Sequence, residues 1–86
     1  MDKEESIKNL NYVVKQMPNP YERYVWYDVE LLNGKKVQAR YTKPGFIHFR
    51  QWRKHILRTP EGEILSEKMD WSYYRANMKT GEMVEL

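Results

Sequence analysis

The first segment of the chain alternates apolar and polar residues with the period of an α-helix. Four apolar residues recur every three or four positions and fall on one stripe: Ile7, Leu10, Val14 and Met17. Asp2, with Glu5 three residues later, matches a capping box, and Pro18-Asn19-Pro20 cannot continue a helix. We therefore predict a helix over residues 3–17. Its apolar stripe is expected to pack on the protein's own sheet, with docking on a partner as the alternative.

Over residues 22–42, apolar and polar positions alternate as in the two strands of a β-hairpin, on either side of an Asn-Gly turn signal that ends at Gly34. A two-residue turn would place Val29 opposite Gln38, whereas a three-residue loop places Val29 opposite Val37. We predict the longer loop, with Gly34 in the left-handed conformation, because its register gathers apolar residues on one face. The same register sets these pairs on the other face: Glu30 with Lys36, and Trp26 with Arg40 as a cation–π contact.

The C-terminal stretch carries a similar pattern. A loop over 79–81 places Ala76 opposite Val84 on one face. The other pairs of that register are compatible with it: Tyr74 with Leu86, and Arg75 with Glu85. We therefore predict a second hairpin over residues 72–86.

The segment between the hairpins fits a strand poorly. A hairpin built on the turn signal at 59–62 would place Lys54 opposite Lys68, and both faces of a strand over 46–58 would mix apolar and charged residues. As a helix, the segment separates an apolar side from a basic ridge formed by Arg50, Lys54 and Arg58. We therefore predict a second, basic helix over residues 46–57.

Together these elements predict an α+β fold, in which the N-terminal helix and the basic helix pack on an antiparallel sheet built from two hairpins. The order is helix, strand, strand, helix, strand, strand, with one more short strand at 64–69. Because no repeat or long linker divides the chain, residues 1–86 are expected to form a single domain. Within it, 1–20 hold the helix and its proline-terminated connector, and 21–86 hold the hairpin, the basic segment and the C-terminal hairpin.

Composition narrows the class of protein. A chain of 86 residues and 10.5 kDa has room for one small core. Its aromatic content of 14% is too high for a disordered chain, and it has no cysteine for a disulfide or a thiolate site. No apolar run reaches the ~18 residues that cross a bilayer, and the acidic start is unlike a signal peptide. We expect a soluble, cytoplasmic protein with no membrane contact.

The net charge of +3 conceals an uneven distribution. Residues 34–60 contain eight Lys or Arg and no Asp or Glu, whereas the segments on either side are both acidic. Such a run favours nucleic-acid binding, because cations displace counterions from phosphates and interleaved aromatic rings stack on unpaired bases. Phosphate contacts are expected from Lys35, Arg40, Lys43, Arg50, Arg53, Lys54 and Arg58. Aromatic contacts are expected from Trp26 and Tyr41.

Other chemistries find less support in the sequence. His48 and His55 are seven residues apart, too far on a helix to share one metal ion, and the isolated glycines form no phosphate-binding loop. We therefore predict a non-enzymatic accessory protein without a metal or cofactor, with nucleic acid as its partner. The alternative is a module or inhibitor that binds a larger protein through exposed Tyr, Trp and Arg, and a homodimer stays open.

Overall fold

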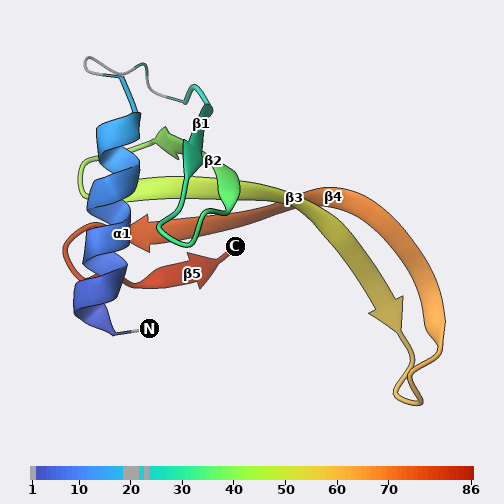
Figure 1. Cartoon of the computed structure of the whole chain (residues 1–86). Helices are drawn as coiled ribbons and strands as arrows, with labels where there is room; N and C mark the ends of the chain where they lie inside the picture. Colours follow the sequence, from blue (N-terminus) through green and yellow to red (C-terminus); the bar gives the residue numbers. More distant parts are fainter. Residues whose placement is uncertain (1, 19–21, 23) are drawn as a thin grey trace.

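The computed structural model describes residues 2–18, 22 and 24–86. One helix and five strands follow one another along this part of the chain: α1 (Lys3–Gln16), β1 (Tyr27–Glu30), β2 (Lys36–Tyr41), β3 (Phe46–Arg58), β4 (Ile64–Asn77) and β5 (Met83–Glu85). The strands form one antiparallel sheet in chain order, and α1 lies across one of its faces (Figure 1). The protein is therefore mostly sheet.

The N-terminal helix confirms the prediction made from its period. The side chain of Asp2 caps it by accepting a 2.9 Å hydrogen bond from the Glu5 N–H, and α1 ends at Gln16 with Met17 as its C-cap. Pro18 follows, while Asn19 and Pro20 lie outside the described residues.

The core lies between α1 and the sheet. Its buried members come from the helix and four of the strands: Leu10, Val13, Met17, Val29, Ala39, Ile47, Phe49 and Ala76. Val13 was not part of the predicted stripe, but it is fully buried beside Leu10. The helix thus packs on the protein's own sheet, as expected, and leaves the opposite face of the sheet uncovered.

The helix also fastens the edge of the sheet through polar side chains. The Gln16 side chain donates to the Glu30 carbonyl at 2.7 Å and accepts from the Glu30 N–H at 2.8 Å. About two turns earlier in α1, Asn9 Oδ1 accepts from the Leu32 N–H at 2.9 Å. These bonds satisfy backbone groups that an edge strand would otherwise leave to water.

The first hairpin has the predicted register. Val29 pairs with Val37, Tyr27 with Ala39 and Glu30 with Lys36, around a three-residue loop that includes Gly34 at φ +88°. Grouping the apolar residues on the helix side therefore outweighs the preference of Asn-Gly for a two-residue turn.

The prediction of a second helix over 46–57 is wrong, and with it the two-helix fold class. These residues belong to β3, which pairs with β4 along its whole length. The register shifts by one residue between Leu57 and Arg58, so that Leu65 is an extra residue in β4 and Lys54 faces Met69 instead of Lys68. This bulge removes the like-charge pair that counted against a hairpin. The short strand predicted at 64–69 is the first part of β4.

The C-terminal hairpin exists, but its predicted register is wrong by one residue. Ala76 pairs with Met83 instead of Val84. The loop has four residues, 78–81, because Asn77 Oδ1 accepts hydrogen bonds from the backbone of Lys79 and Thr80, and Asn77 O accepts one from Gly81. The Asn77 side chain therefore sets the turn length.

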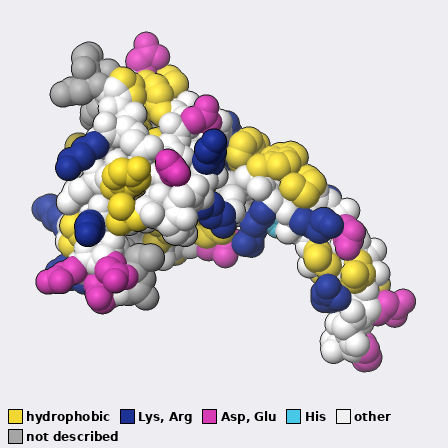
Figure 2. Space-filling model, viewed as in Figure 1, with side chains coloured by type: hydrophobic (Ala, Val, Ile, Leu, Met, Phe, Trp, Pro, Cys, Tyr) yellow, Lys and Arg dark blue, Asp and Glu magenta, His cyan; other side chains and the backbone are white. Residues whose placement is uncertain are grey.

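β3 and β4 continue past the helix-covered part as a curved two-stranded ribbon, which we call the arm (residues 53–70; Figure 1). β2 pairs with β3 only at 47–50, and β5 pairs with β4 only at 74–76. Within the described chain, the arm strands therefore pair only with each other. Hydrophobic, basic and acidic side chains are interspersed along the arm (Figure 2). We call the rest of the described chain the body.

Candidate nucleic-acid interface

The face of the sheet turned away from α1, which we call the open face, carries all three tryptophans together with Phe46 and Tyr73. Residues that pair across neighbouring strands share a face, and successive residues alternate between faces. The pairing therefore places the following residues on the open face: Asp28, Gln38, Arg40, Phe46, His48, Arg50, Trp52, Trp71, Tyr73 and Arg75. Trp26 lies on the same face, because its ring contacts Arg40, Arg50 and Tyr73.

Three tryptophans and two arginines form one cluster on this face. The guanidinium carbon of Arg50 lies 4.4 Å from the ring centroid of Trp26 and 4.1 Å from that of Trp71. The guanidinium carbon of Arg40 lies 4.4 Å from the Trp26 centroid, which confirms the predicted contact between these two residues. Trp52 meets Trp71 edge to face, with 5.2 Å between centroids. Cation–π contacts of this kind hold the arginines in place.

Two rings at the margin of the cluster are exposed to solvent. The exposed fraction is 53% for Trp52 and 41% for Tyr73, whereas Trp26 and Trp71 are half-buried. Tyr73 also contacts Trp26, with 6.2 Å between centroids. The face thus combines covered rings, which fix the arginines, with exposed rings available to a flat ligand.

The arginines of the cluster are not neutralised by carboxylates. Arg50 Nε donates a 2.7 Å hydrogen bond to the Gln38 side chain, whose amide in turn donates to Asp28 at 3.0 Å. An amide therefore separates Arg50 from the nearest acid in this network. Among the described residues, neither Arg40 nor Arg50 forms an ion pair, and the buried Arg40 Nε has no hydrogen-bond partner.

A shallow depression of about 570 Å³ borders the cluster. Arg50, Trp52 and Trp71 line one side of it, and residues of β1 and β2, including Asp28 and Gln38, line the other. Pockets of a few hundred Å³ accommodate small planar ligands. The depression therefore offers a recess beside the exposed Trp52 ring.

Of the predicted phosphate contacts, four share the open face. Arg40 and Arg50 belong to the cluster, and Lys54 and Arg58 follow along β3 at even spacing. The basic ridge predicted on a helix is thus a row along a strand. Towards the tip its charges meet local partners, since Lys54 Nζ lies 4.0 Å from Glu67 and Arg58 donates to the Gly62 carbonyl at 3.0 Å.

The other predicted contacts do not occupy open-face positions of the strands. Arg53 points to the opposite face, where it lies 3.6 Å from Glu85. Lys35 is exposed in the β1–β2 loop, and Lys43 lies 4.6 Å from the centroid of the Phe46 ring. Tyr41 packs against the core from the helix side of the sheet.

Sequence reasoning missed three aromatic members of the open face. The aromatic contacts expected from the sequence were Trp26 and Tyr41, and they did not include Trp52, Trp71 or Tyr73. The regular alternation of side chains between the two faces of a strand could have revealed these residues. Once β3 and β4 are paired through the bulge, Trp52 falls opposite Trp71 and Tyr73 falls opposite Arg50.

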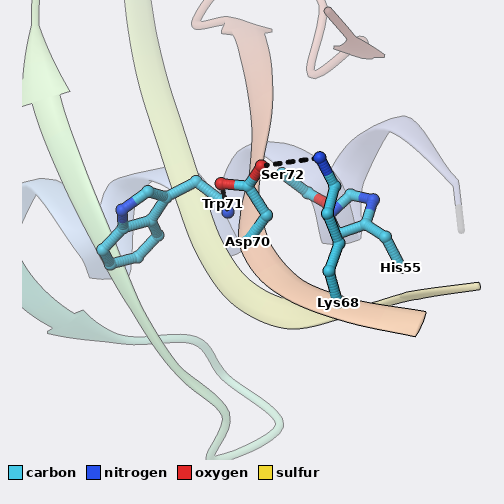
Figure 3. A network of polar contacts seen from close by, with 5 residues as sticks. All are labelled: His55, Lys68, Asp70, Trp71 and Ser72. Carbon is cyan, nitrogen blue, oxygen red and sulfur yellow. Dashed lines mark hydrogen bonds and ion pairs between the residues drawn. The ribbon is translucent and has the colours of Figure 1, made fainter. Parts of the chain in front are cut away.

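A polar network lies on the other face, at the base of the arm (Figure 3). Ser72 Oγ lies 3.2 Å from His55 Nε2, and Ser72 is only 3% exposed. Asp70 binds Lys68 at 3.7 Å and accepts a hydrogen bond from the Trp71 N–H, and no hydrogen bond within the described chain joins Asp70 to His55. A buried serine beside a histidine without an orienting carboxylate lacks the geometry of a catalytic triad.

Two features are absent from the described residues. No group of three or more His, Cys, Asp or Glu is placed to hold a metal ion. No helix there is long and apolar enough to cross a membrane. Comparison with protein-family models, with curated proteins and with solved structures found no match. Function is therefore inferred from the chemistry of the open face.

Proposed function

We propose that the protein is a non-catalytic accessory protein that binds single-stranded nucleic acid on the open face of its sheet. The observation that carries this proposal is the stacking of Arg40 and Arg50 on tryptophan rings without a carboxylate partner. Guanidinium groups held in this way bind phosphates, and they do so in a fixed direction.

The exposed rings favour a single strand over a duplex. Trp52 and Tyr73 offer their rings to solvent beside the arginines, and stacking on such rings needs unpaired bases. The tip of the arm carries Glu61 and Glu63, which repel phosphates. The arm as a whole has four basic and four acidic residues, so it is less suited than the open face to bind a polyanion.

The direct test is fluorescence anisotropy with labelled single-stranded and double-stranded oligonucleotides over a range of salt concentrations. We expect tighter binding of the single strand, and a log affinity that falls linearly with log salt. Binding should also quench tryptophan fluorescence, because all three tryptophans lie in or beside the cluster.

Matched variants separate the open face from general charge and hydrophobicity. Arg50→Gln should weaken binding about tenfold, the loss of one charge-assisted contact, whereas Arg53→Gln removes the same charge from the other face and should have little effect. Trp52→Ala should weaken binding by roughly 1–3 kcal/mol, the typical contribution of one stacked base. Its control is Leu57→Ala, at an exposed position on the other face of the same strand.

Either of two results would refute the proposal. If oligonucleotides do not bind even at low salt, or if Arg53→Gln weakens binding as much as Arg50→Gln, the open face is not a nucleic-acid interface. The alternative, a module or inhibitor that binds a larger protein through exposed Tyr, Trp and Arg, would then be favoured.

A further inference from the structure

Three basic side chains form a row across the open face. Arg40, His48 and Arg75 are direct cross-strand neighbours, one each from β2, β3 and β4. Side chains in such positions start about 5 Å apart. Lys43 approaches from the β2–β3 loop, and its Nζ and the guanidinium carbon of Arg75 lie 4.6 and 5.4 Å from the Phe46 centroid. The row and Lys43 thus bring four basic groups together.

Among the described residues, no carboxylate forms an ion pair with any of these four basic groups, including that of Glu82, whose carbonyl accepts from the Asn77 N–H in the row on the side away from the arm. The next row towards the arm contains Gln38, Arg50 and Tyr73, and Val84 of β5 is the residue paired with Arg75 on its outer side. Asp28 lies beyond Gln38 and is hydrogen-bonded to it. Like charges repel, so a concentration of cations of this kind is stabilised by an anion.

A second observation, besides the concentration of cations, points to a ligand near Arg40. Its Nε is buried and has no hydrogen-bond partner within the described part of the chain, although buried donors are almost always paired. Burial, together with the charges of Arg40, Arg75 and Lys43, holds the pKa of His48 below its usual value of 6.5. At neutral pH the row therefore holds a neutral imidazole between two guanidinium groups.

We propose that Arg40, Lys43, His48 and Arg75 form a binding site for a phosphate group. The source of that phosphate rests on the proposed function, under which it is a phosphodiester of the strand bound to the open face. The arginines supply charge-assisted hydrogen bonds to its oxygens, and Lys43 supplies a point charge. Burial is the first cause of the lowered pKa of His48, and a bound anion opposes the second cause, the repulsion from Arg40, Arg75 and Lys43. The anion therefore raises the pKa of His48, whose protonated ring is a further donor.

The site predicts a pH dependence with a defined sign. The bound anion raises the pKa of His48, so binding takes up a proton and oligonucleotide affinity increases as the pH falls through the histidine range. A phosphodiester has no proton of its own to gain there, so the dependence reports on the protein.

The test is the NMR titration of the His48 imidazole against pH, in chloride alone, with sulfate, and with a short oligothymidylate. Sulfate serves as a phosphate analogue that does not titrate in this range. His55 is the only other histidine, and its signals are the internal reference because it contacts Ser72 on the opposite face. We expect both anions to raise the pKa of His48. At each pH, the His55 signals should be the same with and without the anion.

The variants give a matched pair. Arg75→Gln should remove most of the anion-induced rise in the pKa of His48 and weaken oligonucleotide binding about three- to tenfold. Arg53→Gln, the same change on the other face, should preserve both. The fold of each variant is checked by circular dichroism and by the dispersion of its amide signals.

The outcomes separate this site from the proposed function. If the oligonucleotide binds but neither anion raises the pKa of His48, the phosphate site is refuted and nucleic-acid binding stands. If sulfate raises the pKa of His48 while no oligonucleotide binds, the anion site stands and its proposed source is refuted.

Discussion

The parts of β3 and β4 that lie under α1 and the parts that form the arm share one ladder of backbone pairing but differ in burial. In the body, Ile47 is 0% exposed beneath the helix, whereas on the same face of the arm Leu57 is 59% exposed. Pairing alone therefore does not make a core. The helix supplies the cover that turns the alternation of side chains into burial.

The same contrast holds for charge. In the arm, opposite charges meet across the two strands or along one of them, as in the pairs of Lys54 with Glu67 and Lys68 with Asp70. On the open face of the body, Arg40 and Arg50 stack on aromatic rings instead. Exposed ion pairs contribute little to stability, and they leave little net charge for a ligand. The body is thus the part suited to bind an anion.

The largest expected effect tests the difference in burial. Ile47→Ala should lower the free energy of unfolding by about 2–5 kcal/mol, because it leaves a cavity under α1. Leu57→Ala should change it by no more than about 0.5 kcal/mol, because the arm has no helix above it. Urea denaturation of both variants measures the two values. Equal losses would show that the arm is buried in the folded protein in solution.

A glycine in each region gives a smaller but equally matched test. Gly81 has φ +77°, and a Cβ there would lie 2.8 Å from Ser6 Cβ of α1. Gly62, in the turn of the arm, has φ +90° but no atom within 4 Å of such a Cβ. Gly81→Ala should therefore cost about 2–4 kcal/mol, from left-handed strain plus the clash with the helix.

Gly62→Ala should cost only the strain, about 1 kcal/mol. Thermal and urea unfolding provide the comparison. A larger loss for Gly62→Ala than for Gly81→Ala would contradict the placement of the C-terminal loop against α1.

The smallest expected effect concerns pH. Because burial and its basic neighbours hold the pKa of His48 below 6.5, the unfolded chain takes up a proton at this residue at higher pH than the folded protein does. The free energy of unfolding should therefore decrease as the pH falls through the histidine range. His48→Gln should reduce this dependence. Urea midpoints measured above and below that range provide the test, and an unchanged slope in His48→Gln would count against it.

The helix and the first hairpin could be predicted because each buries a face. The period of α1 and the pairing of Val29 with Val37 follow from residues that contact the core, whereas the cap at Asp2 follows from a local hydrogen bond to the Glu5 N–H. In such segments the hydrophobic pattern and the structure carry the same information.

β3 could not be predicted in this way because half of it has no core beneath it. In the arm, apolar residues such as Ile56 and Leu57 occupy both faces, so the alternation expected of a strand disappears and a helical period fits better. The bulge near Leu65 also changes the pairing partner of every residue between it and the body. Without that register, the contact between Trp52 and Trp71 could not be predicted, and neither could the set of residues on the open face.

The two bonds between the Gln16 side chain and the backbone of Glu30 have a consequence for assembly. A primary amide has the donor and acceptor of a peptide group, so Gln16 occupies the position that a residue of an incoming strand would take. Another chain cannot extend the sheet at this point without displacing it. Aggregation by strand addition is thereby opposed at the β1 edge, and Gln16→Leu would remove this protection while leaving the core residues in place.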